Sequence, residues 1–334
     1  MQISVIICTW NRAEMLRRTL HEFLKLAIPE NTDWEVLVVN NNCTDNTNLV
    51  VKELSSRLPV RMVMEKEQGL SAARNRGVRE SNADLILWTD DDVLVDEYWL
   101  AIYADAMNRL ADVAFFGGPV RPVFDGTPPR WLREGWHTVA DAYAVRDFGN
   151  KVLEITEGRL PFGANYAVRR EIQQRYLYDT KRGRKAKTLL SGEETHVMSS
   201  MLAAGHRGRW LPEASVQHVI GEERQTVRYV RDYYHATGVL ERRLKTSESA
   251  RNRTNAARTW ASIPAWLLRK AVMGETQYRM ARLTKPSVDW LPKLATASHL
   301  WGHLSEVLRE RRHGQEREPR DVTTVSRGAD DHKE

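Results

Sequence analysis

Cysteine and long apolar runs are both scarce in this chain of 334 residues. Its two cysteines, Cys8 and Cys43, are too few for a disulfide framework, and no charged leader with a cleavage site precedes the first apolar stretch. We therefore expect a reducing compartment, the cytoplasm. No apolar run approaches the ~18 residues of a membrane-spanning helix. The longest, around residues 260–272, is interrupted by Pro264, Arg269 and Lys270.

Two glycine-rich phosphate-binding motifs are absent as well. The chain contains no G-x-G-x-x-G, the fingerprint of dinucleotide-binding Rossmann enzymes, and no G-x-x-x-x-G-K-[ST], the loop of P-loop NTPases. Both enzyme classes are therefore disfavoured. The hydrophobic content of 42% is ordinary for a soluble globular protein, and the length allows one large core or two modest ones.

Positive charge is distributed unevenly. The formal net charge is +6, but residues 224–312 contain 18 Lys or Arg and 7 Asp or Glu, which gives +11 there and leaves −5 for the rest. Such an excess favours an anionic partner for the C-terminal part, either nucleic acid or a membrane surface. The alternative is an ordinary solvated basic helix surface.

Strand and helix patterns alternate over the first 120 residues. Strands are predicted at residues 3–8, 34–39, 60–64 and 83–89, and helices at 13–26, 46–58 and 69–79. This alternation predicts a mostly parallel sheet with helices on both faces. Shorter strands follow at 114–117, 163–168 and 209–211, and a helix is predicted within 191–204. We expect three parts: an α/β domain at 1–223, a basic helical region at 224–312 and a disordered tail at 313–334.

Asp90, Asp91 and Asp92 follow an apolar run, Leu85 to Trp88, that is typical of a buried strand. The carboxyl end of a central strand is where open α/β sheets bind ligands. Adjacent carboxylates repel each other unless a cation neutralises them, and hard oxygen ligands favour Mg²⁺ or Mn²⁺. The alternative is an Asp-rich turn that only ends the strand.

Two further polar clusters follow predicted strands. The first strand ends in the sequence CTWNR and the second in NNNCTD, and such side chains can bind a base edge or ribose hydroxyls. Each cluster taken alone is more typical of a turn. Gly69 opens a predicted helix whose amino end favours anions, and Arg74, one turn later, could reach a phosphate.

Glu193 and Glu194 precede another predicted helix. Acidic residues at a helix start usually act as caps, but beside a metal–nucleotide site one of them becomes a candidate general base. His218 lies on a short strand-like segment. A lone histidine is more often structural, although here it could complete a metal shell.

Taken together and in order, the segments SVIICTWNR, EVLVVNNNCTDNT, GLSAARNRG, ILWTDDDV, PFGANYAVRR and GEETHV with LPEASVQH resemble the inverting family-2 glycosyltransferases, which have a GT-A fold. The resemblance spans about residues 2–220. It implies a metal-dependent enzyme that moves a sugar from a nucleotide-diphosphate donor, UDP- or GDP-linked, to an acceptor hydroxyl. The metal would be Mn²⁺ or Mg²⁺, and the product a cell-surface polysaccharide or a glycolipid.

The resemblance also implies roles for individual residues. Thr9, Asn11 and Arg12 would lie under the nucleoside, Asn40 would face the base, and Gly69 with Arg74 would flank the nucleoside and diphosphate. Asp90 and Asp92 form the D-x-D pair, with Asp92, or else Asp91, on the metal together with His218. Gly163, Ala164 and Asn165 would line the sugar site, and the base motif maps to Glu193 and Glu194, with Glu194 as the base.

Two positions depart from the family pattern. Asn40 and Glu194 both stand where aspartate is usual, which changes the expected base contact and the acceptor geometry. Two other functions are kept open. The chain could be a catalytically silent GT-A-like binding module, or it could be a nucleic-acid-binding protein, although it contains no recognised nucleic-acid module.

The C-terminal region carries Trp260, Ile263, Trp266 and Leu267 at helical spacings, among basic residues. This pattern fits a helix lying in a membrane interface, which would suit a lipid-linked acceptor and a peripheral position on the cytoplasmic membrane face. The alternative is that these side chains pack on the catalytic domain and shape its acceptor cleft.

Overall fold

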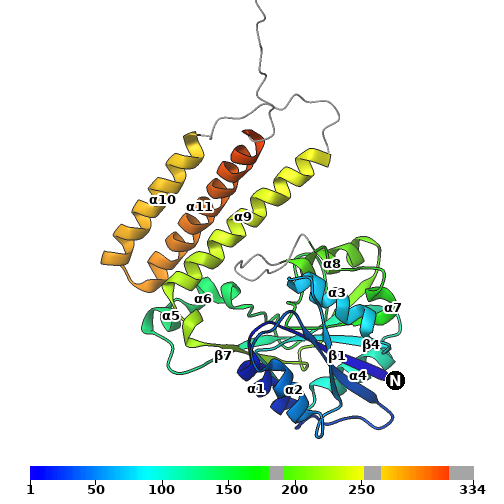
Figure 1. The fold of residues 1–334 in the computed structure, drawn as a ribbon. Coiled ribbons are helices and arrows are strands. Elements are labelled where there is room, and N and C mark those ends of the chain that lie inside the picture. Colours follow the sequence, from blue (N-terminus) through cyan, green and yellow to red (C-terminus); the bar gives the residue numbers. More distant parts are fainter. Residues whose placement is uncertain (181–191, 252–264, 316–334) are drawn as a thin grey trace, which may run out of the picture.

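The computed structural model of the chain describes residues 1–180, 192–251 and 265–315 (Figure 1). Its main element is an eight-stranded sheet in the order β3-β2-β1-β4-β9-β6-β10-β8. In chain order the strands are β1 (Gln2–Thr9), β2 (Asp33–Asn40), β3 (Val60–Met64), β4 (Leu85–Asp90), β6 (Val113–Gly117), β8 (Leu153–Glu154), β9 (Asn165–Arg169) and β10 (Arg207–Trp210). Each predicted strand overlaps one of these, and β8 has no predicted counterpart.

The sheet is mixed. β3, β2, β1 and β4 pair in parallel, as predicted, but β9 pairs antiparallel with both β4 and β6. Parallel neighbours need a crossover that returns the chain to the edge where the previous strand began. The irregular passage before β9 makes no such return. β10 pairs in parallel with β6, so six of the eight strands of this sheet share one direction and β8 and β9 oppose them, which confirms the expected mostly parallel sheet.

Strand register brings three polar segments to one edge of the sheet. Thr9 at the end of β1 lies opposite Asn40, and Cys8 lies opposite Asp90 at the end of β4. Because parallel strands end on the same edge, the residues that follow β1, β2 and β4 gather there. This is the arrangement that the alternating pattern predicts.

Helices cover both faces of the sheet. Successive side chains of a strand point to opposite faces, so Val5 packs on one face and Ile6 on the other. The face of Val5 carries α1 (Ala13–Phe23), α2 (Thr47–Leu54) and α4 (Trp99–Arg109). The face of Ile6 carries α3 (Leu70–Glu80), α7 (Arg170–Gln173) and α8 (Glu193–Ala203).

A second, three-stranded sheet contains β5 (Val93–Val95), β11 (Val216–Ile220) and β7 (Val120–Phe124). β5 follows directly after Asp92, and its antiparallel pairing with β11 places His218 opposite Val93. Strand pairing therefore brings His218 beside the aspartates, although it lies 126 residues from Asp92 in the sequence.

Three long helices, α9 (Val227–Arg251), α10 (Ala265–Thr284) and α11 (Ser287–Gln315), form what we call the helical unit. In it, α11 lies between the other two (Figure 1). Two glycines allow α9 and α11 to approach closely. A Cβ on Gly238 would lie 2.0 Å from the His299 carbonyl oxygen, and one on Gly302 would lie 1.9 Å from that of His235.

The helical unit shares a hydrophobic core with the rest of the chain. The connecting elements are α5 (Arg130–Glu134), α6 (Trp136–Val139), η1 (Ala140–Tyr143) and η2 (Glu222–Arg224). Leu132 and Tyr143 from these elements pack in one cluster with Val230, Tyr278 and Leu291 of the three helices. The domain boundary expected at 223/224 lies at η2, beside this shared core.

The membrane-interface pattern is only partly described. Leu267 is buried against α11, whereas Trp266 is 59% exposed on α10. Trp260 and Ile263 lie outside the described residues. α11 extends to Gln315, so the start of the predicted tail is helical, and residues 316–334 also lie outside the description. Within the described part of the chain, no helix has both the length and the apolar character needed to cross a membrane.

Candidate active site

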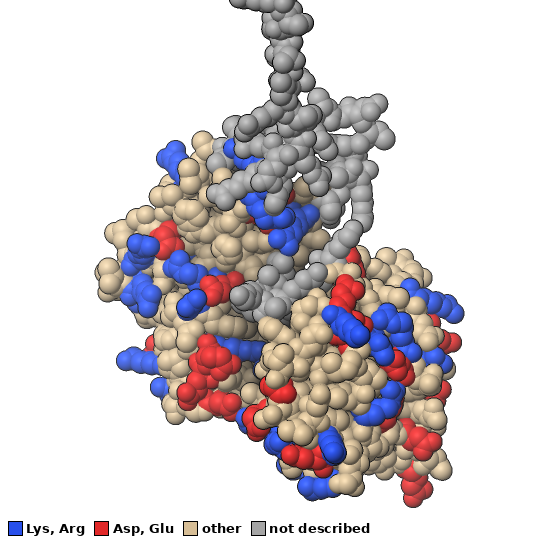
Figure 2. Space-filling model, viewed as in Figure 1, with Lys and Arg blue, Asp and Glu red and all other residues tan. Residues whose placement is uncertain are grey.

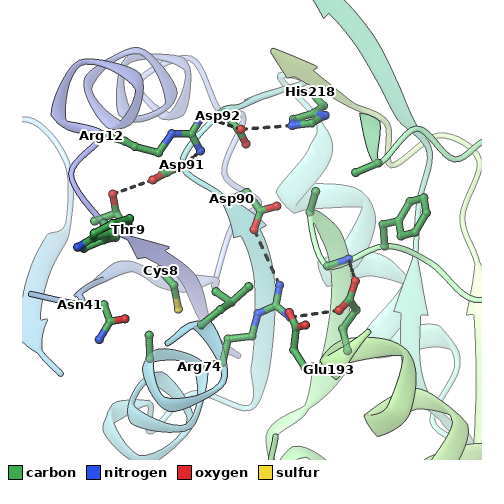
Figure 3. Close-up of a pocket in the computed structure, with 18 of the residues that line it drawn as sticks. Cys8, Thr9, Arg12, Asn41, Arg74, Asp90, Asp91, Asp92, Glu193 and His218 are labelled. Atoms are coloured by element: carbon green, nitrogen blue, oxygen red, sulfur yellow. Dashed lines mark hydrogen bonds and ion pairs between the residues drawn. The ribbon is translucent and has the colours of Figure 1, made fainter. Parts of the chain in front are cut away.

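A cavity of about 360 Å³ opens where β1, β2 and β4 end (Figure 3). The predicted site residues that line it are Thr9, Arg12, Gly69, Arg74, Asp90, Asp91, Asp92, Gly163, Ala164, Glu193, Glu194 and His218. Two elements of the C-terminal half, η2 and α9, contribute Arg224 and Tyr233 to its wall.

Arg12 fixes the second and third aspartates. Its Nη1 lies 2.5 Å from Asp91 Oδ1, and its Nη2 lies 2.9 Å from Asp92 Oδ2. The hydroxyl of Thr9 donates to the other oxygen of Asp91 at 2.7 Å. Both oxygens of Asp91 therefore accept protein donors. Thr9 and Arg12, expected beneath a nucleoside, also orient the carboxylates (Figure 3).

The two neighbouring carboxyls differ in their affinity for protons. Burial raises the pKa of Asp91 to about 6, although Arg12 opposes the shift. Burial acts in the same direction on Asp92, but His218, Arg12 and Arg224 together hold the pKa of Asp92 well below its usual range. Asp92 is therefore the one that keeps a full negative charge near neutral pH.

His218 stands next to this charge in a defined orientation. Its Nδ1 lies 2.6 Å from the Tyr143 carbonyl oxygen, and its Nε2 lies 3.2 Å from Asp92 Oδ2. A carbonyl oxygen only accepts, so Nδ1 carries the hydrogen and Nε2 of the neutral ring presents a lone pair beside Asp92.

This pair fits the divalent cation that the sequence implies. A carboxylate oxygen and an imidazole nitrogen are both common ligands of such ions, and here they lie side by side. Within residues 1–180, 192–251 and 265–315, no group of three or more His, Cys, Asp or Glu side chains forms a complete metal site. Asp92 and His218 would therefore hold the ion together with phosphate oxygens of a substrate and water.

Arg74 gathers three carboxylates on the other side of the cavity. Its Nη1 lies 2.8 Å from Glu193 and 3.7 Å from Glu194, and its Nη2 lies 3.9 Å from Asp90. Burial opposes the charge, but the surrounding groups hold the pKa of Arg74 well above its usual value. In this structure Arg74 anchors carboxylates, and the expected phosphate contact stays a prediction.

The two glutamates at the start of α8 differ in their contacts. Glu193 Oε1 accepts the short bond from Arg74, whereas Glu194 Oε1 accepts only a 3.4 Å contact from the Gly163 backbone N–H. Glu194 Oε2 accepts no hydrogen bond within the described residues, and Glu194 lines the cavity. A Cβ on Gly163 would lie 2.3 Å from Arg74 Nη2, so a larger residue there would require Arg74 to move. Glu194 is therefore the less tightly held carboxylate.

Three predicted site residues do not line the cavity. Asn165 is fully buried, and its side chain bonds Trp99, Tyr103 and the carbonyls of Pro119 and Ala214, so its expected place in the sugar site stays a prediction. Asn40 is equally buried. It bonds Asn48 and the Cys43 backbone and does not line the cavity, so its expected contact with the base also stays a prediction.

Asn11 also lies outside the cavity wall. Its φ of 53° is a turn conformation that Asn tolerates, and its side-chain oxygen accepts bonds from Thr44. In all three cases an amide side chain bonds the backbone or another side chain of the protein, which is the common use of Asn in turns.

Several cavity residues escaped the sequence analysis. Asn41, next to the predicted Asn40, lines the cavity and accepts the Gly69 backbone N–H at 2.8 Å. The polar run 40–42 could have indicated it, but not which of the three amides faces inward. Arg224 and Tyr233 come from segments with no local motif, so only the fold identifies them.

Comparison with known proteins identifies the family. The family model described as glycosyl transferase family 2 matches residues 4–188, which is more than half of the 334 residues. The succinoglycan biosynthesis protein ExoM of Rhizobium meliloti (strain 1021) is 26% identical over 236 residues, which cover 69% of this chain and 71% of that protein. The chondroitin synthase of Escherichia coli is 27% identical over 157 residues, which are 46% of this chain and 21% of that protein.

Solved structures show the same fold. A mannosyltransferase from Pyrobaculum calidifontis, in complex with GDP-Man and Mn²⁺, superposes with a TM-score of 0.57 at 19% identity, over 92% of this chain and 87% of that one. TarS residues 1–349 of S. aureus, in complex with UDP-GlcNAc, gives 0.52 at 15% identity, over 94% and 92%. The sheet is thus GT-A-like, and the chain is a glycosyltransferase that belongs to glycosyl transferase family 2.

Proposed function

We propose that the chain is an inverting, divalent-cation-dependent glycosyltransferase that uses a UDP- or GDP-linked sugar. One observation carries the proposal. A single cavity holds the Asp92–His218 pair on one side and the buried glutamates of α8 on the other (Figure 3). A cation position and a carboxylate base are the two groups that displacement of a nucleotide diphosphate requires. The similar proteins bound to GDP-Man and UDP-GlcNAc support a donor of this class.

In this mechanism Glu194 takes the proton of the acceptor hydroxyl. The acceptor oxygen then attacks the anomeric carbon on the face opposite the diphosphate, and the bond from carbon to phosphate oxygen breaks through an oxocarbenium-like state. Arg74 keeps both glutamates in place. Bound at Asp92 and His218, a divalent ion would neutralise the departing diphosphate. A single displacement inverts the anomeric centre.

Donor hydrolysis tests the cation assignment. We expect a panel of UDP- and GDP-sugars to reveal one that is hydrolysed with Mn²⁺ and not with EDTA. Asp92→Ala should nearly abolish this hydrolysis, because it removes the oxygen that lies beside His218. Asp105→Ala, on the exposed side of α4, is the matched control and should behave as the wild type. Wild-type hydrolysis by Asp92→Ala would overturn the assignment.

The alternative of a catalytically silent binding module predicts the opposite result in this assay. Such a protein would bind nucleotide but hydrolyse no donor. We disfavour it because the cation pair and the glutamates line one cavity. A salt titration on DNA and RNA would detect the nucleic-acid function, which no observation at the cavity favours.

The sugar acceptor that we propose is a polymeric or membrane-bound substrate. The similarity to a succinoglycan biosynthesis protein supports a polysaccharide or glycolipid acceptor.

The exposed face of α10 supports a peripheral membrane position. It carries Trp266, Met280 and Leu283 at 59%, 66% and 87% exposure, with basic side chains between them. Figure 2 shows tan and blue side chains mixed over the helical unit. The free cysteines Cys8 and Cys43 fit a cytoplasmic location.

A further inference from the structure

Arg224 already fills the position at which the two cation ligands meet. Its Nη1 lies 3.0 Å from His218 Nε2, and its Nη2 lies 3.2 Å from Asp92 Oδ2. One guanidinium therefore touches both ligand atoms, and those atoms lie 3.2 Å apart from each other.

When the His218 ring is neutral, the hydrogen-bond pattern favours a donor or a cation at this position. His218 Nδ1 donates to the Tyr143 carbonyl, so His218 Nε2 is an acceptor when the ring is neutral. Asp92 Oδ2 is an acceptor too, and two acceptors at 3.2 Å repel each other unless a donor or a cation joins them. The planar fork of Arg224 supplies one N–H to each. A divalent ion would satisfy the same two atoms.

Arg224 is anchored at its base, and its tip reaches the cavity. It ends the short helix η2, and its own carbonyl oxygen accepts the Tyr143 hydroxyl at 3.2 Å. Its side chain is 15% exposed and lines the cavity, and its guanidinium carbon lies 6.0 Å from the centre of the Tyr229 ring. The long side chain can therefore turn toward a ligand in the cavity without any change in the backbone.

We propose that Arg224 is a counter-cation that holds the divalent-ion position in the donor-free protein and moves to the diphosphate when ion and donor bind. This inference rests on the proposed cation dependence. An ion arriving alone must displace Arg224 from the buried carboxylate of Asp92. The guanidinium of Arg224 then has no anionic partner. An ion arriving with a nucleotide diphosphate gives Arg224 a new partner, because guanidinium groups bind phosphate well. The ion and the nucleotide should therefore bind cooperatively, each strengthening the other by the same factor.

The test measures Mn²⁺ binding to the full chain by electron paramagnetic resonance, without nucleotide and with UDP or GDP. Arg224→Met keeps an unbranched, flexible side chain and removes the guanidinium, so we expect about tenfold tighter Mn²⁺ binding without nucleotide, within the range typical of coupled sites. Added nucleotide should then tighten Mn²⁺ binding less than in the wild type. Arg228→Met is the matched control, since Arg228 is an exposed arginine on α9 that also loses one positive charge, and it should bind as the wild type.

A second variant separates competition from misfolding. Arg224→Lys keeps the charge but replaces the two-nitrogen fork with a single ammonium nitrogen, so its Mn²⁺ affinity should lie between those of the wild type and Arg224→Met. Unchanged or weaker binding by a folded Arg224→Met, checked by circular dichroism, overturns the inference alone. Failure of all these proteins to bind Mn²⁺, even with nucleotide, overturns the cation dependence and the inference together.

Discussion

The sheet region (residues 1–220) and the helical unit use their buried charges in different ways. In the sheet region the buried charges gather at one edge, where Arg12 and Arg74 divide the carboxylates of the cavity between them. In the helical unit charges pair one helix with the next, as Arg243 of α9 does with Glu306 of α11 at 2.9 Å. Charge thus builds a site in the first region and holds helices together in the second.

The family model covers only part of the sheet region. Its match ends at residue 188, so it covers neither α8 with its two glutamates nor any helix of the helical unit. Yet Arg224 and Tyr233, from the segment that leads into and forms α9, line the same cavity. The cavity therefore combines residues from inside the family match with residues from outside it.

The largest expected effect concerns the glutamates. Glu194→Gln keeps the shape and removes the proton acceptor, so transfer should fall by about 10²–10⁴-fold while nucleotide affinity changes little. Turnover on the identified donor and calorimetric titration with the nucleotide measure the two quantities. Glu193→Gln is the paired variant. A larger loss of turnover in Glu193→Gln, with its arginine contact intact in a crystal structure, would move the base to Glu193.

The next effect tests the packing of the helical unit. Gly302→Ala places a methyl group 1.9 Å from the His235 carbonyl oxygen, so α9 and α11 must separate, at a cost of about 1–3 kcal/mol in the free energy of unfolding. Gly274→Ala is the matched control. There the nearest atom is 3.6 Å away, and the better helix propensity should stabilise by up to about 1 kcal/mol. Urea unfolding followed by circular dichroism measures both. Equal stability of the two variants would contradict the close packing.

The smallest effect concerns the surface of α10. Arg269 and Lys270 are exposed beside Trp266, and each basic residue near an anionic surface contributes about 1 kcal/mol. We expect the wild type to sediment with anionic vesicles at low salt and to be released at high salt. Arg269→Glu/Lys270→Glu should weaken this binding by at least about tenfold. A wild-type protein that stays in the supernatant at low salt would remove the membrane position from the proposal.

Much of the fold could be predicted from local sequence patterns. The apolar runs before Thr9, Asn40 and Asp90 indicate the three strands whose ends form the cavity, because strand periodicity and turn residues are local signals. The antiparallel β9 could not be predicted, since strand direction depends on where a long irregular connection returns to the sheet. The two-residue strand β8 could not be predicted either.

The site was predictable where a side chain follows a strand or begins a helix. Asp92, Glu194 and His218 all line the cavity as expected from their positions. Asn40 and Asn165 were assigned to ligands by resemblance, but in this structure their amide groups bond backbone and side-chain groups of the protein. A sequence shows that an amide is available, not which neighbour it satisfies.

Tyr143 links the sheet region to the helical unit, and this link matters for protein engineering. Its carbonyl oxygen orients His218, while its ring lies in the core shared with the three helices, 5.3 Å from the ring of Tyr229. One residue thus ties the imidazole that faces Asp92 to the packing of α9. The sheet region and the helices are therefore not interchangeable parts. A chimera that keeps residues 1–223 and takes its helices from a homologue must also reproduce the contacts that the helices make with the Tyr143 ring. Otherwise the imidazole of His218 loses its orientation.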